Sequence, residues 1–503
     1  MSGSDIVLAT QNATWTHPSF GLRCLRSNLG PWREHCRIVE LDPRASPAAA
    51  AHTILDGAPR IVGLGVYIWN VMGLTEVARR LKEERPNLVL VLGGPEISHE
   101  WDDQPIARWA DYIVRNEGEL VFADLCARLL QGERPADRVL DGGRPPLERL
   151  ALPYDEYTDA DLTSRFTYVE TTRGCPYGCA FCLSSLDRAV REWPLDAVLA
   201  ALDRLLSRGA RRLKFVDRTF NLNPKRASTV LRFLLERIRP GCSVHFEWVP
   251  TGPLPAIGQW LAKFPPETLR LEVGIQTFDE DVNARVGRCQ RAPAVEDTLR
   301  FLHEQTHARV HADLLVGLPG QTLNTVAHDF DRLLALGPAE IQVGLLKRLR
   351  GTTLARHAAE WELRFDVAPP YPIIETPDFS VRDLARVARL ARYWERLGNQ
   401  SQFPRSLRRL WRDEASAFAA LLRLSDALYA RFEATHAIPL EKIAEAIFEH
   451  LVSRGITREE AAEWVWTDYA RDGRRRHPPR ALRRWLTRSG GSSLFPFSSS
   501  PRE

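Results

Sequence analysis

The first part of the chain alternates short apolar runs with stretches of helical periodicity. Nearly continuous apolar runs occupy residues 5–10, 60–67, 88–95 and 111–115. A helical pattern at 74–83 lies between two of them. Strands that are apolar on both faces are typical of a parallel sheet covered by helices on both sides. The pattern therefore predicts a doubly wound, flavodoxin-like α/β domain over residues 1–130.

A second region repeats the alternation in about six strand–helix units. The predicted strands are 166–171, 212–217, 243–250, 270–276, 311–317 and 340–346. The predicted helices are 194–207, 227–238, 294–305 and 324–336. Such units predict a partial, open (βα)6 TIM-like barrel over residues 164–365. Functional residues of these barrels lie at the carboxyl ends of the strands.

Three further segments complete the predicted organisation. Residues 131–163 contain glycine and proline turns without periodicity, and are expected to be a linker. Residues 366–472 show helical spacing of apolar positions and predict a helical C-terminal domain. Residues 473–503 are basic and rich in serine and glycine near the end, which predicts a disordered tail. A solvated terminus is favoured there over contact with nucleic acid.

Composition narrows the class of protein. The chain has 503 residues, enough for two to four domains, and an apolar fraction of 44% that is ordinary for a globular protein. No stretch approaches the roughly 20 apolar residues of a membrane span, and the N-terminus lacks the pattern of a signal peptide. We therefore expect a cytoplasmic protein without membrane contact. The net charge of +4 is too small to indicate a nucleic-acid partner.

Three cysteines lie close together at Cys175, Cys179 and Cys182, with the spacing C-x3-C-x2-C. Three thiolates on a short loop can hold three irons of a four-iron, four-sulfur cluster and leave the fourth iron open. The same spacing is also one stripe of a helix, which would make them buried core residues. A proline between the first two cysteines and a glycine before each of them disfavour a helix. The pattern therefore favours a [4Fe-4S] cluster as a cofactor.

The run from Tyr168 to Cys182 resembles the signature of the radical S-adenosylmethionine (radical SAM) superfamily. The resemblance implies that SAM chelates the open iron through its amino and carboxylate groups. It also implies that one electron from the cluster cleaves a carbon–sulfur bond of SAM and yields a 5′-deoxyadenosyl radical. An electron donor such as flavodoxin or ferredoxin is then an expected partner.

Glycine and polar residues follow the predicted strands of the first domain, where ligands of doubly wound sheets bind. These segments resemble the cobalamin-binding domain that precedes many radical SAM cores. The alternative is a Rossmann-like domain with another ligand or with none. By resemblance the cobalamin contacts are Tyr67, Trp69, Asn70, Gly93, Gly94, Glu96, Glu117 and Glu119. The Asp-x-His-x-x-Gly motif is absent, which implies cobalamin without a histidine from that motif and with its lower face toward 67–70.

Four polar residues lie on or after barrel strands, at positions where an apolar pattern would not place them. They are Glu247, Gln276, Arg288 and Asp313. Each could be a buried structural group with a local partner. Together they resemble, in order and rough spacing, the SAM-contacting set of the coproporphyrinogen-oxidase-like branch. The resemblance implies that Glu247 and Gln276 contact the methionyl part or the adenosine, Arg288 the SAM carboxylate and Asp313 the ribose hydroxyls.

Two later runs, 345–354 and 369–377, resemble a bacterial subgroup of cobalamin-type radical SAM proteins with an uncharacterised C-terminal domain. The resemblance implies a cobalamin-dependent methyltransferase that acts on an unactivated carbon of a small molecule or natural product. One alternative is non-methylating radical SAM chemistry, such as rearrangement, cyclisation or aminocarboxypropyl transfer. Another is a non-catalytic corrinoid sensor or carrier, which the intact cysteine triplet disfavours. The sequence does not indicate the substrate.

Overall fold

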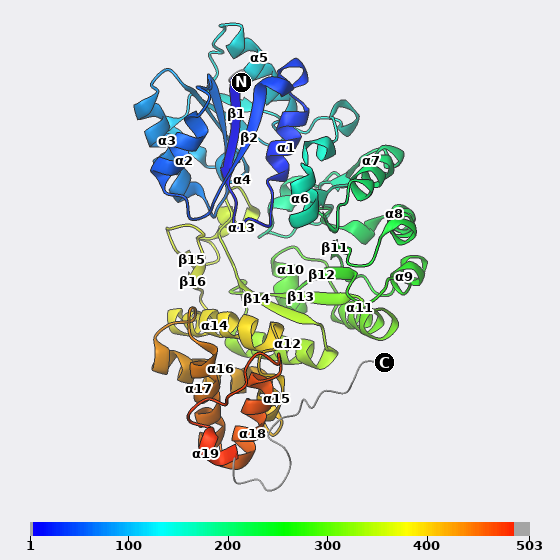
Figure 1. Ribbon diagram of the computed structural model, residues 1–503, viewed down its shortest axis with the longest axis vertical. Coiled ribbons are helices and arrows are strands. Elements are labelled where there is room, and N and C mark those ends of the chain that lie inside the picture. Colours follow the sequence, from blue (N-terminus) through cyan, green and yellow to red (C-terminus); the bar gives the residue numbers. More distant parts are fainter. Residues whose placement is uncertain (1–3, 487–503) are drawn as a thin grey trace.

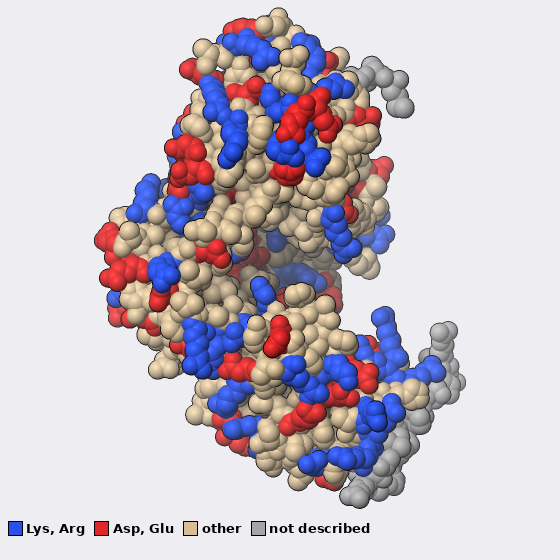
Figure 2. All heavy atoms as spheres, turned by 90° about the vertical axis from the view of Figure 1, so that its left-hand side faces the viewer, with Lys and Arg blue, Asp and Glu red and all other residues tan. Residues whose placement is uncertain are grey.

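The computed structural model describes residues 4–486 and has three parts stacked along its long axis (Figure 1). The first part is a sheet covered by helices, the second is an open barrel, and the third is a group of helices. Figure 2 shows a recess between the first and third parts, with charged side chains in its depth. The N-terminal end lies in the first part, far from the C-terminal helices.

The first sheet has six parallel strands in the order β2-β1-β3-β4-β5-β6. Its strands are β1 (Ile6–Gln11), β2 (Cys36–Leu41), β3 (Ile61–Gly65), β4 (Val89–Gly93), β5 (Tyr112–Arg115) and β6 (Val139–Asp141). The helices of this part are α1 (Phe20–Ser27), α2 (Pro47–Leu55), α3 (Val71–Glu84), α4 (Pro95–Ser98) and α5 (Glu119–Leu130).

Successive side chains of β1 point to opposite faces of the sheet and enter two separate cores. Val7 and Ala9 belong to the core that includes residues of α2 and α3. Ile6 and Leu8 belong to the core that includes residues of α1 and α5. Burial on both faces explains why the strands are almost continuously apolar in the sequence, and the predicted doubly wound sheet is confirmed.

Two strands of this sheet were not predicted. β2 mixes charged and apolar residues because it is an edge strand, buried only at some of its positions. β6 has three residues within the predicted linker, too few to show a period, yet it pairs with β5. The first sheet thus extends past residue 130, where the predicted domain ends. The short helix α6 (Asp159–Ser164) then leads to the second part.

The second sheet is also parallel, in the order β14-β13-β12-β11-β10-β7, and its two outer strands do not pair with each other. Its strands are β7 (Thr167–Val169), β10 (Arg212–Phe215), β11 (Ser243–Trp248), β12 (Leu269–Gln276), β13 (Arg309–Val316) and β14 (Glu340–Leu345). The helices of this part are α7 (Leu195–Ser207), α8 (Pro224–Arg237), α9 (Pro255–Leu261), α10 (Glu280–Arg285), α11 (Ala292–Gln305) and α12 (Leu323–Leu336). This arrangement is the predicted open barrel.

The two faces of the second sheet differ in chemistry. The residues that pack against the helices are apolar, as at Leu213 and Phe246. The alternate positions carry Lys214, His245, Glu272 and His311, which are partly exposed. Closed barrels fill their interior with branched apolar side chains. The inner face here is ionisable, so the open barrel has a polar interior in place of an apolar core.

The third part is helical, as predicted. Its helices are α14 (Val381–Trp394), a π-helical turn (Glu395–Asn399), α15 (Pro404–Trp411), α16 (Ala417–Phe432), α17 (Leu440–Ser453), α18 (Arg458–Tyr469) and α19 (Arg483–Leu486). The indole Nε1 of Trp394 donates a hydrogen bond to the carbonyl oxygen of Ile341 over 2.9 Å, which fixes this part to the barrel. Within residues 4–486 no helix is both long and apolar enough to cross a membrane.

The predicted disordered tail differs from the structure at its beginning. Leu482 and Leu486 are buried in the core that the barrel shares with the helical part. Ala481 and Trp485 also pack against this core, and the many arginines around these few apolar residues hide the pattern in the sequence. The remainder of that prediction, residues 487–503, lies outside the described residues.

A buried clamp joins the first part to the segment after the barrel. That segment contains α13 (Thr353–His357) and the antiparallel pair β15 (Arg364–Phe365) and β16 (Ile373–Glu375). The Oε1 atom of Glu96 accepts hydrogen bonds from Gln104 at 2.6 Å, Tyr371 at 2.8 Å and Arg350 at 3.2 Å. Nearby, Glu100 binds Arg348 at 2.7 Å. The runs 345–354 and 369–377 therefore supply residues of the interface between parts.

Replacing Tyr371 with Phe should destabilise the protein. The change removes the hydroxyl that donates to Glu96 and accepts from Gln104, and it leaves both groups under-satisfied in a buried site. The expected loss in the free energy of unfolding is about 1–3 kcal/mol. Denaturant unfolding of both proteins measures it. Tyr429→Phe at the surface is the control, and an equal effect of both changes would contradict the clamp.

Candidate functional site

The three cysteines lie in one loop at the carboxyl end of the first barrel strand. The loop begins after β8 (Thr172–Arg173) and ends at β9 (Arg191–Glu192), and these two short strands pair antiparallel. Residues 174–182 form no helix, which excludes the helical stripe as an explanation of the spacing. Cys175 and Cys179 are buried, and Cys182 is partly exposed.

Backbone contacts fix the shape of this loop. The amide of Cys175 donates to the carbonyl oxygen of Asp187 at 2.8 Å, and that of Ala180 donates to Val286 at 2.8 Å. Gly174 has a φ of +92°, and a Cβ there would lie 2.2 Å from the carbonyl oxygen of Ala189. Only glycine fits this position, because its conformation and the close backbone both exclude a side chain.

The environment of the cysteines requires a compensating positive charge. Burial raises the pKa of Cys175 and of Cys179, and the guanidinium of Arg288, 3.6 Å from the Cys179 sulfur, partly opposes the shift of Cys179. Bound iron would stabilise the thiolates in the same way. Among residues 4–486, no three metal-ligating side chains are close enough to bind one ion. A four-iron cluster makes a different demand, since each thiolate binds a different iron.

The four residues expected to contact SAM surround the inner face of the barrel near this loop. Glu247 pairs with Arg218 at 2.9 Å, and burial raises its pKa although Arg218 opposes the shift. Gln276 has a φ of +69° at a bulge of β12, an unusual conformation for a residue with a side chain. Arg288 donates to Gln290 at 3.0 Å and approaches Cys179, so it connects the cysteine loop with the region around β12.

Asp313 is the least satisfied member of the set. Burial raises the pKa of Asp313 well above its usual range, and the carboxylates of Glu272 and Glu247 raise it further. Its Oδ1 atom is buried without a hydrogen-bond partner, 3.3 Å from Nε2 of His311 in a geometry that makes no hydrogen bond. A buried acceptor of this kind fits a ligand that brings hydroxyl donors, such as a ribose.

Sequence reasoning missed the rest of the polar inner face. Glu272 accepts a hydrogen bond from His245 at 2.9 Å and lies 3.6 Å from Lys214, which together lower its pKa to about 2. His311 lies on the next strand, opposite Glu272 in the register. The signal was available in the sequence, because each of these residues alternates with apolar neighbours along its strand.

A cavity of about 430 Å³ lies at the carboxyl edge of the first sheet. Its wall in the first part includes Leu8, Leu22, Gly63, Gly65, Tyr67, Val91, Gly93, Gly94, Val114 and Phe122. On the opposite side the cavity is lined by Arg173, Gly174, Ser184, Asp187 and Arg218. One cavity therefore extends from the first sheet to the cysteine loop.

Glycines keep this cavity open. A Cβ at Gly63 would lie 2.8 Å from a methyl carbon of Leu8, and one at Gly94 would lie 2.5 Å from the carbonyl oxygen of Val66. The φ of +106° at Gly94 also excludes other residues. The slot is apolar, and glycines without side chains lie at its narrow points. Such a slot fits a large, flat cofactor with an extended tail, as cobalamin has.

The predicted cobalamin contacts divide into two groups. Tyr67, Gly93, Gly94, Glu117 and Glu119 line the cavity. Trp69, Asn70 and Glu96 are not among its lining residues. Asn70 instead holds the loop after β3, donating to the Thr10 hydroxyl and to the Gly65 carbonyl. Trp69 is 54% exposed and stacks on Tyr67 at 4.5 Å between ring centres, while Glu96 belongs to the clamp.

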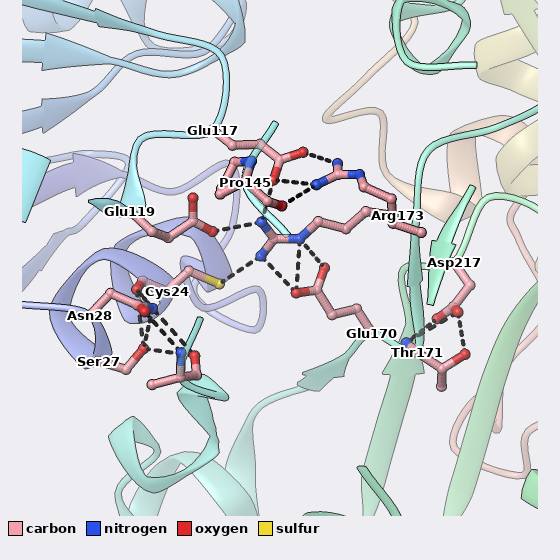
Figure 3. A network of polar contacts seen from close by, with 12 residues as sticks. Cys24, Ser27, Asn28, Glu117, Glu119, Pro145, Glu170, Thr171, Arg173 and Asp217 are labelled. Atoms are coloured by element: carbon pink, nitrogen blue, oxygen red, sulfur yellow. Dashed lines mark hydrogen bonds and ion pairs between the residues drawn. The ribbon is translucent and has the colours of Figure 1, made fainter. Parts of the chain in front are cut away.

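The carboxylates of Glu117 and Glu119 point toward the second part of the chain. Figure 3 shows the guanidinium of Arg173 surrounded by Glu117, Glu119 and Glu170. Glu117 and Glu119 follow β5 in the first part, whereas Arg173 lies two residues before Cys175. The first part is thus bound directly to the segment that carries the cysteines.

Family comparisons agree with this division of the chain. Residues 7–126 match the B12 binding domain, and residues 169–333 match the radical SAM superfamily. The chain therefore contains a B12-binding domain and a radical SAM domain. Residues 359–494 match a family described as a protein of unknown function (DUF4080), in agreement with the predicted subgroup.

Among curated proteins, the chain is similar to an uncharacterised methyltransferase, PH0819, of Pyrococcus horikoshii. The two are 29% identical over 240 residues, which cover 42% of this chain and 51% of the relative. The cobalamin-dependent radical SAM methyltransferase TokK of Streptomyces tokunonensis is 28% identical over 151 residues, covering 25% and 22%. The chain thus spans about half or less of the length of these two relatives.

Two solved structures share the fold. The cobalamin-dependent SAM radical enzyme OxsB, with aquacobalamin and SAM bound, aligns with a TM-score of 0.63 and 14% identity over 96% of this chain and 84% of OxsB. The methyltransferase TsrM of Kitasatospora setae, with cobalamin and a [4Fe-4S] cluster bound, aligns with a TM-score of 0.58 and 17% identity over 73% and 78%. The predicted order of sheet, barrel and helical region is confirmed.

Asp313→Asn should change the stability of the protein in a pH-dependent way. The raised pKa of Asp313 means that the folded state keeps this proton to a higher pH than the unfolded chain does. The wild type therefore loses stability as the pH rises above the usual range of aspartate, and the amide removes that loss. The free energy of unfolding of the variant should exceed that of the wild type by the largest amount near about pH 8. This difference should shrink toward about pH 5.

Urea unfolding over this pH range measures the difference. Asp378→Asn, at an exposed position, is the control for the loss of one carboxylate. If the difference in the free energy of unfolding between Asp313→Asn and wild type does not vary with pH, the Asp313 carboxyl has no raised pKa.

Proposed function

We propose that this protein is a cobalamin-dependent radical SAM methyltransferase that acts on an unactivated carbon of a small molecule. The observation that carries the proposal is the cavity that extends from the glycine-lined edge of the first sheet to the cysteine loop. Methyl transfer through cobalamin and radical formation from SAM both require the two cofactors to face a common space. The shared cavity provides such a space.

The cysteine loop and the inner face of the barrel hold the cluster and SAM in this proposal. Cys175, Cys179 and Cys182 bind three irons, and the fourth iron and SAM together supply a carbon radical when bound. Arg288, whose guanidinium lies 3.6 Å from the Cys179 sulfur, would bind the SAM carboxylate. Asp313 offers its unpartnered oxygen to the ribose. A flavodoxin or ferredoxin would deliver the electron.

Cobalamin occupies the glycine-lined cavity in this proposal. Tyr67, Gly93 and Gly94 form part of the wall, and the apolar slot between Leu8 and Phe122 suits the nucleotide tail of the cofactor. No histidine is among the residues that line this cavity in the described part of the chain. These residues would hold cobalamin without offering it an imidazole, and the bound cofactor would supply a methyl group for transfer.

The proposed substrate is a polar small molecule. The recess between the first and third parts is open to solvent and contains charged side chains (Figure 2). The inner face of the barrel adds Lys214, His245 and His311. These groups suit a hydrogen-bonding substrate better than an apolar lipid, because burying them without polar partners is costly. Similarity to proteins named as methyltransferases favours methylation over the other radical SAM reactions.

Replacing Cys175, Cys179 and Cys182 together with Ala should abolish the cluster. After anaerobic reconstitution the wild type should hold about four irons per chain. The triple variant should hold none, because the three thiolates are the only strong iron ligands proposed. Iron and sulfide analysis measures the loss, and formation of 5′-deoxyadenosine from SAM should stop. Cys242→Ala removes a buried thiol elsewhere and should keep the iron. A full cluster in the triple variant would refute the assignment.

Protein loaded with hydroxocobalamin should bind one equivalent without a histidine on cobalt. The reduced cob(II)alamin state should show no hyperfine splitting from a lower nitrogen ligand. When a low-potential reductant converts the bound cofactor to cob(I)alamin, SAM should methylate it and leave S-adenosylhomocysteine, which reports methyl transfer from SAM. Electron paramagnetic resonance and chromatography measure these results. The absence of cobalamin binding would instead indicate a cobalamin-independent radical SAM enzyme.

Gly93→Val provides a matched test of the cavity. A Cβ at Gly93 would meet its nearest neighbour at an ordinary 3.6 Å, so the strand tolerates it while the methyl groups reduce the space in the cavity. Gly344 on β14 has the same 3.6 Å clearance and does not line the cavity. Gly93→Val should lose cobalamin, and Gly344→Val should keep it.

A further inference from the structure

Two arginines close the base of the loop that carries the cysteines. Arg173 and Arg191 are register partners in the short ribbon formed by β8 and β9, so they stand opposite each other at the two ends of the loop. Every cysteine of the triplet lies between them in sequence. This pair of arginines therefore marks the two ends of the cysteine loop.

Both arginines bind the same carboxylate of the first part. The Nη1 atom of Arg173 lies 2.9 Å from Oε2 of Glu117, and Nη1 of Arg191 donates to the same oxygen at 3.2 Å. The Nη2 atom of Arg191 also donates to Oε1 of Glu117. Glu117 thus bridges the two ends of the cysteine loop, and we name this arrangement the Glu117 clasp.

Neighbouring carboxylates add further ion pairs to the clasp. Arg173 also binds Glu119 at 2.8 Å and Glu170 at 2.8 Å (Figure 3). Arg191 binds Asp187 at 2.9 Å, and the backbone oxygen of Asp187 accepts the amide of Cys175. Removing one member of this partly buried network leaves its partners with unpaired charge, which is costly.

The backbone of Glu117 is held tightly at the wall of the cavity. A Cβ at Gly142 would lie 1.9 Å from the carbonyl oxygen of Glu117, so the segment after β6 packs directly against it. Asn116, the preceding residue, has a φ of +61°. Glu117 also lines the proposed cobalamin cavity. One residue therefore contacts both the cavity and the two ends of the cysteine loop.

We propose that Glu117 is a positioning residue that couples the two cofactor sites. The proposal rests on the function proposed above, in which the cavity holds cobalamin and the loop holds the cluster. A ligand that contacts Glu117 in the cavity favours the side-chain orientation in which its carboxylate binds Arg173 and Arg191. The cluster loop then loses less conformational entropy when iron binds, so each site increases the affinity of the other.

Thermodynamic linkage makes this coupling measurable from either side. If the cluster raises the affinity for cobalamin by some factor, cobalamin raises the affinity for the cluster by the same factor. Couplings of this type typically amount to about 5- to 150-fold. The ratio of two affinities is the useful quantity, because a change that only weakens the cobalamin site alters both affinities equally and leaves the ratio unchanged.

Equilibrium dialysis of the full chain with hydroxocobalamin gives the ratio. The dissociation constant is measured under anaerobic conditions on wild-type protein with the reconstituted cluster and on the same protein without iron. The cluster-loaded wild type should bind hydroxocobalamin more tightly by about 5- to 150-fold. In Glu117→Gln the ratio should fall to about 1 while both cofactors still bind.

Two further variants make the test specific. Arg191→Gln breaks the clasp from the side of the cysteine loop and should also abolish the coupling. Adding it to Glu117→Gln should change the ratio no further, since both act through one contact. Glu100→Gln removes a carboxylate that binds Arg348 and Arg350 in the other contact between parts. It should keep the wild-type ratio.

The outcomes separate the two proposals. A wild type that binds both cofactors with a ratio near 1 would overturn the coupling and leave the proposed function intact. An unchanged ratio in Glu117→Gln and Arg191→Gln would overturn the role of Glu117. An equal loss in Glu100→Gln would assign the coupling to the interface as a whole and so refute the clasp. A wild type that binds no cobalamin or no iron would overturn both proposals.

Discussion

All strands of a parallel sheet direct their following loops to one edge, and in this protein two such edges share a cavity. The first sheet contributes the ends of β3, β4 and β5, and the second contributes the loop after β7. Because the loops are where doubly wound sheets and barrels hold ligands, the meeting of the two edges brings both candidate sites together. The positions of the cysteine loop and of the residues that line the cavity follow from this arrangement.

Buried ion pairs maintain the contact between the two edges. One group surrounds Glu96 and binds the segment after the barrel, and another surrounds Arg173 and binds the cysteine loop. Such pairs contribute little net stability compared with apolar packing, because the charges must first lose their water. They do require defined partners and geometry. A polar interface of this kind thus specifies how the parts are oriented while leaving a cavity between them.

The open barrel differs from a closed one in the chemistry of its inner face. Lys214, His245, Glu272 and His311 occupy positions that a closed barrel fills with apolar side chains. Since β7 and β14 do not pair, the inner face remains accessible, and ionisable groups can keep partial contact with water. Core stability then comes from the apolar outer face and its helices. The interior is left free to hold ligands.

Local sequence determined the features that depend on neighbouring residues. The apolar periodicity indicated both parallel sheets, and the spacing of Cys175, Cys179 and Cys182 with nearby glycine and proline indicated a cluster loop. Short or edge strands such as β2 and β6 gave no such signal, because pairing rather than composition makes them strands. Tertiary structure alone decided which charges meet: Glu117 and Arg191 are 74 residues apart, and Glu96 and Tyr371 are 275 apart. Contacts at such separations arise only when distant segments of the chain pack together, which no local pattern encodes.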